Sequence, residues 1–322
     1  MSVLAMDLGG TKLAVGVITA TGDLVTEEKL LLGSRTGKAV GELIADQCKQ
    51  YVEIQQKSGD PIQSIGISIP GISDEKAGTV WAPNIPGWEA YPLIREIEEI
   101  TENLPVHVSG DRNCYIAGEY WKGNAQQCSN AIFIAVGTGI GAGILADYKI
   151  LSGSNNISGA IGWMALERPF DSSQHAAGCF ESMASGTGIV SVAKKLLEKN
   201  TTYTGVLKDI PVSEIKAHDL FSAYSKQDEI AIKVFNQCIE LWGMAVANLV
   251  SIFNPEKIIF GGGIFGPAIQ FIPAIEQEAK KWAQPISMQH VSIEASALGS
   301  HAGLYGAAWQ ALQHKKQKDL YV

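Results

Sequence analysis

The 322-residue chain has few basic residues and no long, uninterrupted apolar run. It carries 25 Lys and Arg against 33 Asp and Glu, so its formal charge at pH 7 is 25 − 33 = −8. A chain without a basic surface is not expected to bind nucleic acid. The longest apolar stretch, residues 131–146, is interrupted by glycines and Thr138, and we therefore expect no membrane-spanning segment.

Cysteine is also scarce. The five cysteines are scattered and form no Cys-x-x-Cys pair: Cys48, Cys114, Cys128, Cys179 and Cys238. An odd number without a paired framework favours reduced thiols over disulfides. The N-terminus has no positively charged segment followed by a long apolar stretch, as a signal peptide would have. These absences predict a cytoplasmic protein.

The residues that are present indicate a folded enzyme-sized chain. Hydrophobic residues make up 46% of it and its mean hydropathy is +0.08, values typical of a soluble globular protein. Its length is enough for about two domains, each with its own core. Helical spacing of apolar residues predicts helices over residues 38–56, 89–103 and 227–253.

The stretch Leu4–Val17 predicts a strand, a tight turn and a second strand. Asp7 ends the first strand and Gly9-Gly10 form the turn, where backbone N–H groups can approach an anion. Thr11 and Lys12 add donors, and Asp7 is placed to hold a cation through water. This is not a P-loop, which needs a longer Gly spacing and a following helix. An ordinary Gly-Gly hairpin is the alternative interpretation.

A second strand–turn–strand pattern covers residues 131–145, with Gly137, Thr138 and Gly139 at the turn. Two related hairpins indicate a duplicated architecture in which each half contributes a phosphate-binding turn. The spacing Gly137-x-Gly139-x-x-Ala142 also matches a dinucleotide fingerprint, the basis of a dehydrogenase hypothesis. That fingerprint requires a following helix and an acid about 20 residues on, and neither is predicted here.

On these residues the chain resembles the sugar kinases of the actin-like (ribonuclease H-like) superfamily, and within it the ROK family (repressors, open reading frames, kinases). The motifs that carry the resemblance are Asp7–Lys12, Gly137–Gly143 and Gly261–Gly263. It implies an α/β fold of two ribonuclease H-like (actin-like ATPase) domains around an interdomain cleft. The expected domains are 1–122, completed by a C-terminal helix in 303–322, and 123–302.

The resemblance implies ATP and Mg²⁺ as cofactors, with Asp7 holding the metal through water. The residues expected to bind the nucleotide are the acid, hydroxyl, amine and glycines of the three motifs: Asp7, Gly9, Gly10, Thr11, Lys12, Gly137, Thr138, Gly139, Gly261, Gly262 and Gly263. For the last three glycines, a simple strand-to-helix turn is the alternative. Asp111, between a predicted strand and a predicted helix, is the expected general base, although Asp is also a favoured helix N-cap.

For the acceptor sugar, the resemblance points to Gly71, Asn84, Asp111 and Glu181, and Trp163, where the chain departs from the family pattern, is a fifth candidate. Carboxylates and amides suit pairs of hydroxyl groups. Each of these residues has a plain structural alternative; Asn84, for example, stands among prolines and is a natural turn residue.

The chain departs from the family pattern where substrate is expected. Ala160 and Trp163 replace a Glu and a His of the family's Gly-Glu-x-Gly-His run, and Gly110 replaces the Asn before the base. Of the family's usual zinc-binding cysteines, this chain keeps only Cys179. Cys179 and the nearby His175 are too few ligands for a structural zinc, so we expect no zinc. Trp163 is suited to stacking on a sugar face or an apolar substituent, which predicts an acceptor other than plain glucose.

We therefore predict an ATP-dependent kinase that phosphorylates the 6-hydroxyl of a hexose or modified hexose. The resemblance implies a homodimer, and the chain begins at the hairpin, without the helix-turn-helix of the family's repressors. The main alternative is a sensor that binds sugar and nucleotide without turnover. Polyphosphate stays open as a donor in place of ATP.

Overall fold

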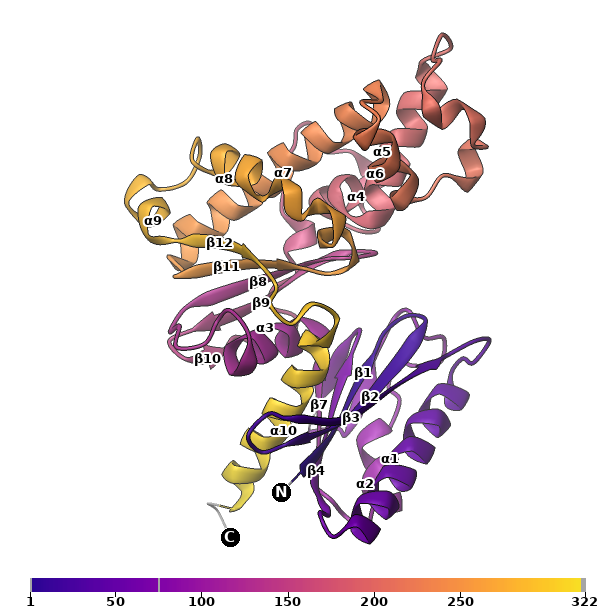
Figure 1. Ribbon diagram of the computed structural model, residues 1–322, viewed down its shortest axis with the longest axis vertical. Coiled ribbons are helices and arrows are strands. Elements are labelled where there is room, and N and C mark those ends of the chain that lie inside the picture. Colours follow the sequence, from indigo (N-terminus) through magenta and orange to yellow (C-terminus); the bar gives the residue numbers. More distant parts are fainter. Residues whose placement is uncertain (1, 75, 320–322) are drawn as a thin grey trace. The chain divides into compact units, whose positions relative to one another are not determined.

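The computed structural model describes residues 2–74 and 76–319, with side chains up to residue 315. It divides into two compact units, each described here by itself (Figure 1). Unit 1 is Met1–Gln127, Ile150–Ser158 and Ala297–Val322, and unit 2 is Cys128–Lys149 and Gly159–Ser296. Compared with the domains expected from sequence, unit 1 gains residues 123–127, 150–158 and 297–302.

Hydrogen bonds explain why these extra segments belong to unit 1. The buried Glu119 carboxylate accepts the backbone N–H of Asn124 at 2.7 Å and that of Leu298 at 3.2 Å. The side-chain amide of Asn156 donates to the carbonyl of Ser73 at 2.8 Å. Polar groups buried in this way must be paired, so these bonds attach the segments to unit 1.

The sheet of unit 1 has the strand order β3-β2-β1-β4-β7. β1 and β2 form an antiparallel hairpin, β3 continues it, and β4 and β7 are parallel to β1. The strands are β1 (Ser2–Leu8), β2 (Lys12–Thr19), β3 (Leu24–Leu31), β4 (Ile62–Ile69) and β7 (Val106–Gly110). A separate two-stranded ribbon pairs β5 (Ile72–Asp74) with β6 (Thr79–Trp81).

The sheet of unit 2 repeats this pattern in the order β10-β9-β8-β11-β12. β8 and β9 are antiparallel, whereas β11 is parallel to both β8 and β12. The strands are β8 (Ala131–Val136), β9 (Ile140–Ala146), β10 (Lys149–Ile150), β11 (Lys257–Gly261) and β12 (Ser292–Ala295). Each unit therefore has one Gly-rich hairpin and two strands parallel to its first strand.

Helices cover both faces of the unit 1 sheet: α1 and α2 one face, α3 and α10 the other (Figure 1). Their bounds are α1 (Lys38–Ser58), α2 (Leu93–Ile100), α3 (Asp111–Lys122) and α10 (Ala302–Asp319). α3 and α10 cross closely, since a Cβ atom on Gly306 would lie 1.7 Å from the carbonyl of Cys114. Only glycine permits this contact, which brings the C-terminal helix onto the sheet.

The core of unit 2 is built around the long helix α7, with Phe235 and Trp242 fully buried. The helices of unit 2 are α4 (Cys179–Ala184), α5 (Gly186–Lys199), α6 (Ala217–Ser225), α7 (Glu229–Phe253), α8 (Ile272–Ala279) and α9 (Pro285–His290). Asp228 caps α7 by accepting the N–H of Ile230 at 2.9 Å. By length and composition α7 is apolar enough to cross a membrane, but most of that apolar stretch is buried inside unit 2.

Short 3₁₀ helices connect these elements. They are η1 (Ile161–Trp163), η2 (Ser172–Gln174), η3 (Val206–Asp209), η4 (Val212–Glu214), η5 (Gly263–Phe265), η6 (Pro267–Phe271) and η7 (Gly299–His301). Two of them belong to the sequence motifs: η1 contains Trp163, and η5 begins at the third glycine of the late motif.

Candidate active site

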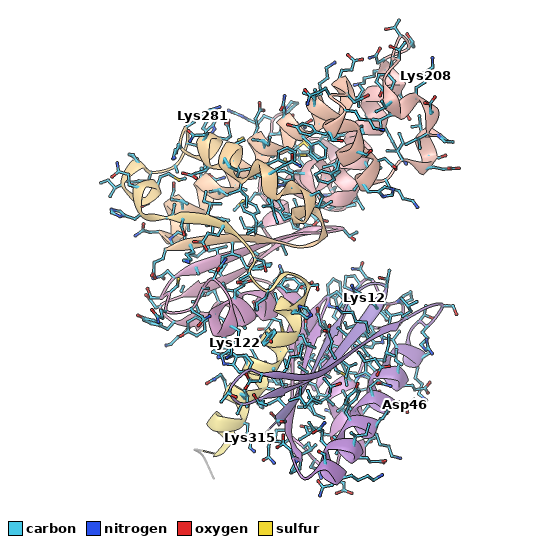
Figure 2. All side chains as sticks on the ribbon, viewed as in Figure 1. Lys12, Asp46, Lys122, Lys208, Lys281 and Lys315 are labelled. Atoms are coloured by element: carbon cyan, nitrogen blue, oxygen red, sulfur yellow. The ribbon has the colours of Figure 1, made fainter. Side chains whose placement is uncertain are left out.

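The β1–β2 turn of unit 1 presents exposed donors at its tip. The N–H of Gly9 donates to the carbonyl of Lys12 at 2.9 Å and closes the turn. Gly10, Thr11 and Lys12 are exposed, and Lys12 stands at the start of β2 (Figure 2). The turn therefore has the backbone, hydroxyl and ammonium groups that an anion requires.

Asp7, at the end of β1, has a perturbed carboxyl group. Burial raises its pKa to about 6; the Ser68 hydroxyl opposes this rise and the neighbouring Asp111 carboxylate adds to it. Its Oδ1 atom is buried and accepts no hydrogen bond from the described residues. A buried hydrogen-bond acceptor without a partner costs free energy of folding. Such unsatisfied groups are typical of sites that bind a ligand.

Asp111 is the first residue of α3, directly after β7. The backbone N–H of Arg112 donates to its Oδ1 at 2.7 Å, and the Tyr115 hydroxyl to its Oδ2 at 3.4 Å. Burial raises the pKa of Asp111, while the Arg112 charge and N–H oppose the rise. The N-cap residue of α3 is Gly110, and Asp111 is the first residue of the helix. Asp111 is therefore not the N-cap that the alternative interpretation of this residue requires.

Two neighbours of these acids were not predicted from sequence. Tyr115 lies one helical turn after Asp111, a spacing from which the contact is recognisable once Asp111 is singled out. Gly303 of α10 faces Asp7, and a Cβ atom there would lie 2.4 Å from Oδ2 of Asp7. No local pattern reveals this second contact, because it joins residues almost 300 positions apart in the chain.

The β8–β9 turn of unit 2 resembles the first hairpin in its closure. The N–H of Gly137 donates to the carbonyl of Gly139 at 2.9 Å, and Thr138 is exposed at the tip. The start of α5 supports the turn, since the Thr187 hydroxyl donates to the carbonyl of Thr138 at 2.9 Å. The chain after the turn enters strand β9 instead of a helix, so the context that a dinucleotide fingerprint requires is absent.

Glu181 of α4 lies against this second turn. Its Oε2 accepts the N–H of Ile140 at 2.6 Å, and a Cβ atom on Gly139 would lie 2.5 Å from the same oxygen. Burial raises the pKa of Glu181, and the Ile140 N–H opposes the rise. Trp163 is 56% exposed, so much of its side chain is accessible to a ligand. The structure thus gives Glu181 a structural contact that the sequence did not reveal.

The three consecutive glycines after β11 differ in what surrounds them. A Cβ atom on Gly261 would lie 2.2 Å from the Phe133 ring, and one on Gly262, whose φ is +89°, would lie 2.5 Å from the carbonyl of Val136. Both positions therefore require glycine for packing. Gly263 has open space where a side chain would stand.

Gly10 and Gly137 share this property with Gly263. None of the three has a positive φ, and no atom lies within 4 Å of an added Cβ. Neither backbone conformation nor packing explains why these positions lack a side chain. Close approach of a ligand to the backbone is a reason that remains, and one such glycine occurs in each of the three motifs.

The two remaining acceptor candidates of unit 1 lie at different depths. A Cβ atom on Gly71 would lie 2.0 Å from the carbonyl of Trp81, so packing against β6 requires this glycine. Asn84 is exposed in the loop after β6. Trp88, four residues further along the chain, is buried, donates from its indole to the carbonyl of Gly37 at 3.0 Å and stacks on Tyr91.

Within residues 2–74 and 76–319, no group of three or more His, Cys, Asp or Glu side chains is arranged to hold a metal ion. His175 and Cys179 flank the turn before α4, where the zinc-binding run of the family is expected. The expectation of no structural zinc stays a prediction for elemental analysis of the purified protein.

The sequence profile of the ROK family matches residues 3–314 of this chain. The chain belongs to the ROK family. A glucokinase of Halalkalibacterium halodurans is 31% identical over 320 residues, which are 98% of this chain and 96% of that protein. A xylose repressor of Caldicellulosiruptor bescii is 30% identical over 95% of this chain and 76% of its own length.

The solved structures agree on the fold. The ROK glucokinase of Streptomyces griseus, crystallised with glucose and AMPPNP, has a TM-score of 0.76 and 28% identity over 97% of this chain and all of that one. The two α/β units, each with the same sheet order, confirm the actin-like ATPase fold that the motifs predicted.

Proposed function

We propose that this ROK protein is an ATP-dependent carbohydrate kinase that transfers the γ-phosphoryl group to a primary hydroxyl, the 6-position of a hexose-like acceptor. The observation that carries the proposal is the pair Asp7 and Asp111, two half-buried carboxylates near the ends of β1 and β7, with the Asp111 charge raising the pKa of Asp7. Perturbed acids beside a Gly-rich turn are typical of a catalytic centre. The named activities of the kinase relatives point the same way.

Asp111 acts as the general base. Its raised pKa makes the carboxylate a better proton acceptor, and Arg112 and Tyr115 hold its orientation. The acceptor hydroxyl gives its proton to Asp111 while its oxygen forms a bond to the γ-phosphorus. The bond from that phosphorus to the β,γ-bridging oxygen breaks, and ADP leaves with the electron pair.

Asp7 fits the role of a magnesium-holding residue. Its buried Oδ1 atom accepts no hydrogen bond from the described residues, and Mg²⁺ prefers carboxylate and water oxygens. Bound with ATP, the ion would neutralise the negative charge of the phosphates. We infer that Asp7 holds it through water, because Mg²⁺ usually keeps several of its waters in protein sites.

The open glycines supply the backbone contacts to the nucleotide. We propose that the turns containing Gly9–Lys12 and Gly137–Gly139 bind phosphate oxygens, and that Gly261–Gly263 lies against the adenosine. Space at Gly10, Gly137 and Gly263 supports this assignment. Polyphosphate would bind the phosphate turns but would not contact the adenosine-binding glycines. A Gly263→Leu variant should therefore weaken activity with ATP and leave activity with polyphosphate unchanged.

For the acceptor we propose Gly71, Asn84 and Asp111 in unit 1, and Trp163 and Glu181 in unit 2. The exposed side chain of Trp163 suits stacking on a sugar ring. Ala160 beside it removes a charge found in the family pattern, and this supports an acceptor other than plain glucose. We further expect a cytoplasmic homodimer, which light scattering of the purified protein will test.

The deciding experiment measures ADP release with MgATP across hexoses, amino and N-acetyl sugars, ketoses, cyclitols and disaccharides. Asp111→Asn is the test variant, and Asp46→Asn, an acid on the outer helix α1, is the matched control. We expect Asp111→Asn to lower kcat about 10²–10⁴-fold with ATP binding retained, while the control stays at wild-type rate. Equal rates for the two variants would refute Asp111 as the base.

A sugar sensor without turnover is the second candidate. The observation that favours it is the similarity to a xylose repressor over 95% of this chain. The sensor hypothesis predicts calorimetric binding of sugar and ATP with no ADP released by the wild-type protein. Release that depends on Asp111 rejects it.

A further inference from the structure

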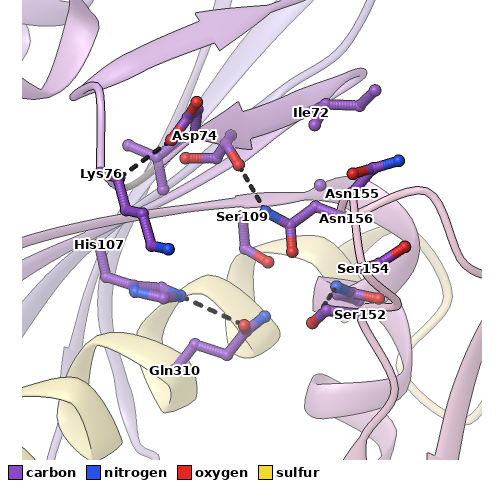
Figure 3. Close-up of a pocket in the computed structure, with 14 residues that line it drawn as sticks. Ile72, Asp74, Lys76, His107, Ser109, Ser152, Ser154, Asn155, Asn156 and Gln310 are labelled. Atoms are coloured by element: carbon purple, nitrogen blue, oxygen red, sulfur yellow. Dashed lines mark hydrogen bonds between the residues drawn. The ribbon is translucent and has the colours of Figure 1, made fainter.

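Unit 1 contains a pocket of about 540 Å³ beside the edge strand β7 (Figure 3). Five stretches of chain line it: β5 with Lys76, β7, the start of α3, residues 152–156, and α10. Its size is within the range of roughly 300–1,000 Å³ that small-molecule pockets have. None of the residues that we assign to the phosphoryl-transfer chemistry lines it.

The lining is polar and balanced in charge. Its side chains include four carboxamides and four serine hydroxyls, and the carboxamides are Asn113, Asn155, Asn156 and Gln310. Asp74 and Lys76 contribute one charge of each sign. Amides and hydroxyls both donate and accept hydrogen bonds, as the hydroxyl groups of a sugar do. This composition favours a neutral, polyhydroxylated ligand over a phosphate or a carboxylate.

Several of these groups are held in place by the wall. Asn156 donates to the carbonyl of Ser73 at 2.8 Å, and Asn113 donates to the Ser152 hydroxyl at 3.4 Å. Gln310 pairs with His107 across 3.3 Å between Oε1 and Nε2. The amide nitrogens of the two asparagines are thus engaged with the pocket wall, which fixes the orientation of both side chains. Prearranged polar groups lower the entropy cost of binding.

A further polar atom in the wall has no partner. The Ser73 residue is 5% exposed, and its hydroxyl oxygen is buried without a hydrogen bond from the described residues. A buried hydroxyl in this state costs free energy unless a ligand or water satisfies it.

The pocket begins next to the proposed acceptor residues. Ile72 and Gly110 line it, and they directly adjoin Gly71 and Asp111 in the chain. These two parts of the wall meet, because a Cβ atom on Gly110 would lie 2.8 Å from the carbonyl of Gly71. The pocket wall therefore includes Gly110, the residue directly before Asp111, and Asn113, two residues after it.

From this juxtaposition we propose that the acceptor is a glycoside or short oligosaccharide. One ring presents its primary hydroxyl to Asp111, and a second ring lies in the pocket between β7 and residues 152–156. The inference rests on the proposed kinase activity and names its substrate class: a neutral saccharide of two or more rings. Asn113, Asn156 and Gln310 bind the hydroxyls of the second ring.

The test uses the full chain and a variant that fills the pocket. Ser154 is exposed in segment 152–156, so Ser154→Trp is expected to fold. Ser58→Trp, at the exposed C-terminal end of α1 and outside the pocket lining, is the matched control. Maltose, cellobiose, trehalose and sucrose are compared as acceptors with glucose and with glucose 1-phosphate, a charged probe.

We expect at least one disaccharide to have a higher kcat/KM than glucose. Ser154→Trp should lower the ratio of the disaccharide kcat/KM to the glucose kcat/KM by about tenfold or more. A tenfold change corresponds to the loss of one or two hydrogen bonds to the second ring. Ser58→Trp should leave this ratio unchanged. A monosaccharide as best acceptor with an unchanged ratio in Ser154→Trp overturns the proposal but leaves the kinase intact. A preference for glucose 1-phosphate overturns the neutral-ligand assignment.

If no compound is phosphorylated, the kinase proposal fails by itself. The same disaccharides are then titrated into wild-type protein and both variants by calorimetry. Binding that Ser154→Trp abolishes and Ser58→Trp preserves supports the second-ring pocket. Binding that is equal in both variants, or undetectable for all four disaccharides, overturns it.

Discussion

The two Gly-rich hairpins have the same strand pairing but use carboxylates differently. In unit 1, Asp7 stands two residues before the first glycine of the turn, and its Oδ1 accepts no hydrogen bond from the described residues. In unit 2, Ala135 occupies the corresponding position before Gly137. The nearby acid there is Glu181, which is bonded to the N–H of Ile140 at 2.6 Å.

This difference shows how a duplicated element diverges. One hairpin keeps an acid whose buried Oδ1 atom accepts no hydrogen bond from the described residues, a costly arrangement that a metal–nucleotide ligand would relieve. The other hairpin has an acid that holds the turn in shape. We therefore expect Asp7 to matter for activity more than for stability, and the Glu181–Ile140 contact to matter for stability.

The largest expected effect is that of Asp7→Asn. This variant removes the carboxylate charge that we propose holds magnesium. It should lower kcat by about 10²–10³-fold, the size of effect seen when one electrostatic contact of a transition state is lost. Thermal stability should stay or rise, since a buried charge disappears. Steady-state ADP release and a melting curve check this. Wild-type turnover in Asp7→Asn would mean that the two hairpins are functionally alike.

The pH dependence of stability tests the same charge. The pKa of Asp7 rises from an ordinary 3.8 to about 6 on folding, so between these values the native chain binds more protons than the unfolded chain. The free energy of unfolding therefore falls as pH rises from about 4 to 6, by at most about 3 kcal/mol, and is regained on acidification. Urea titrations across this range measure the slope.

Asp7→Asn is the control for the pH experiment, because it lacks the titrating group and should flatten this part of the profile. Activity is expected to change in the opposite direction. It should fall as pH drops through about 6, where Asp7 becomes protonated and loses its attraction for a cation. If the pH profiles of stability and activity were the same in the wild-type and Asp7→Asn proteins, Asp7 would be neither the titrating group nor the cation-holding residue.

Two glycine substitutions distinguish a glycine required by packing from a glycine that lets a ligand approach the backbone. Gly262→Ala forces a Cβ atom against the Val136 carbonyl at a positive φ and should cost about 1–3 kcal/mol of stability. Gly137→Ala meets open space, so its stability should change by less than about 0.5 kcal/mol. We expect Gly137→Ala to raise the KM for ATP instead. Unaltered nucleotide kinetics in Gly137→Ala would show that its open space is not used.

The smallest effect is expected for Glu181→Gln. The Gln oxygen can still accept the Ile140 N–H, and the buried charge is removed, so stability should stay within about 0.5 kcal/mol. Glu181→Leu loses the acceptor and should cost about 1–3 kcal/mol. Chemical denaturation compares the two. Equal stability of the Gln and Leu variants would show that this bond does not hold the hairpin.

Local sequence patterns predicted the elements that depend on near neighbours. The helices expected at 38–56 and 227–253 correspond to α1 and α7 within two residues at each end. The helix expected at 89–103 is shorter, Leu93–Ile100, because Tyr91 pairs with Val80 through two backbone hydrogen bonds of 2.8 and 2.9 Å. Periodicity does not reveal that pairing, which comes from a strand outside the window.

The residues of the candidate site were singled out from local sequence in the same way, and their roles stay predictions. Asp7, Asp111 and the three glycine motifs are recognised from short stretches, since turn and helix-start chemistry involves only a few consecutive residues. The pairing of Glu181 with Ile140, the contact of Gly303 with Asp7, and the inclusion of residues 150–158 in unit 1 join distant parts of the chain. Nothing in their local sequences indicates these partners.

The amino-acid order thus settles the two hairpins, the long helices and the family, because strand alternation and glycine turns act over a few residues. Folding in three dimensions decides which acids are perturbed. Asp7 acquires its pKa of about 6 from burial beside Ser68 and Asp111, residues on other strands and helices. The polar pocket is likewise assembled from residues between Ile72 and Gln310. Burial and charge act through space, and only the tertiary structure specifies which residues meet there.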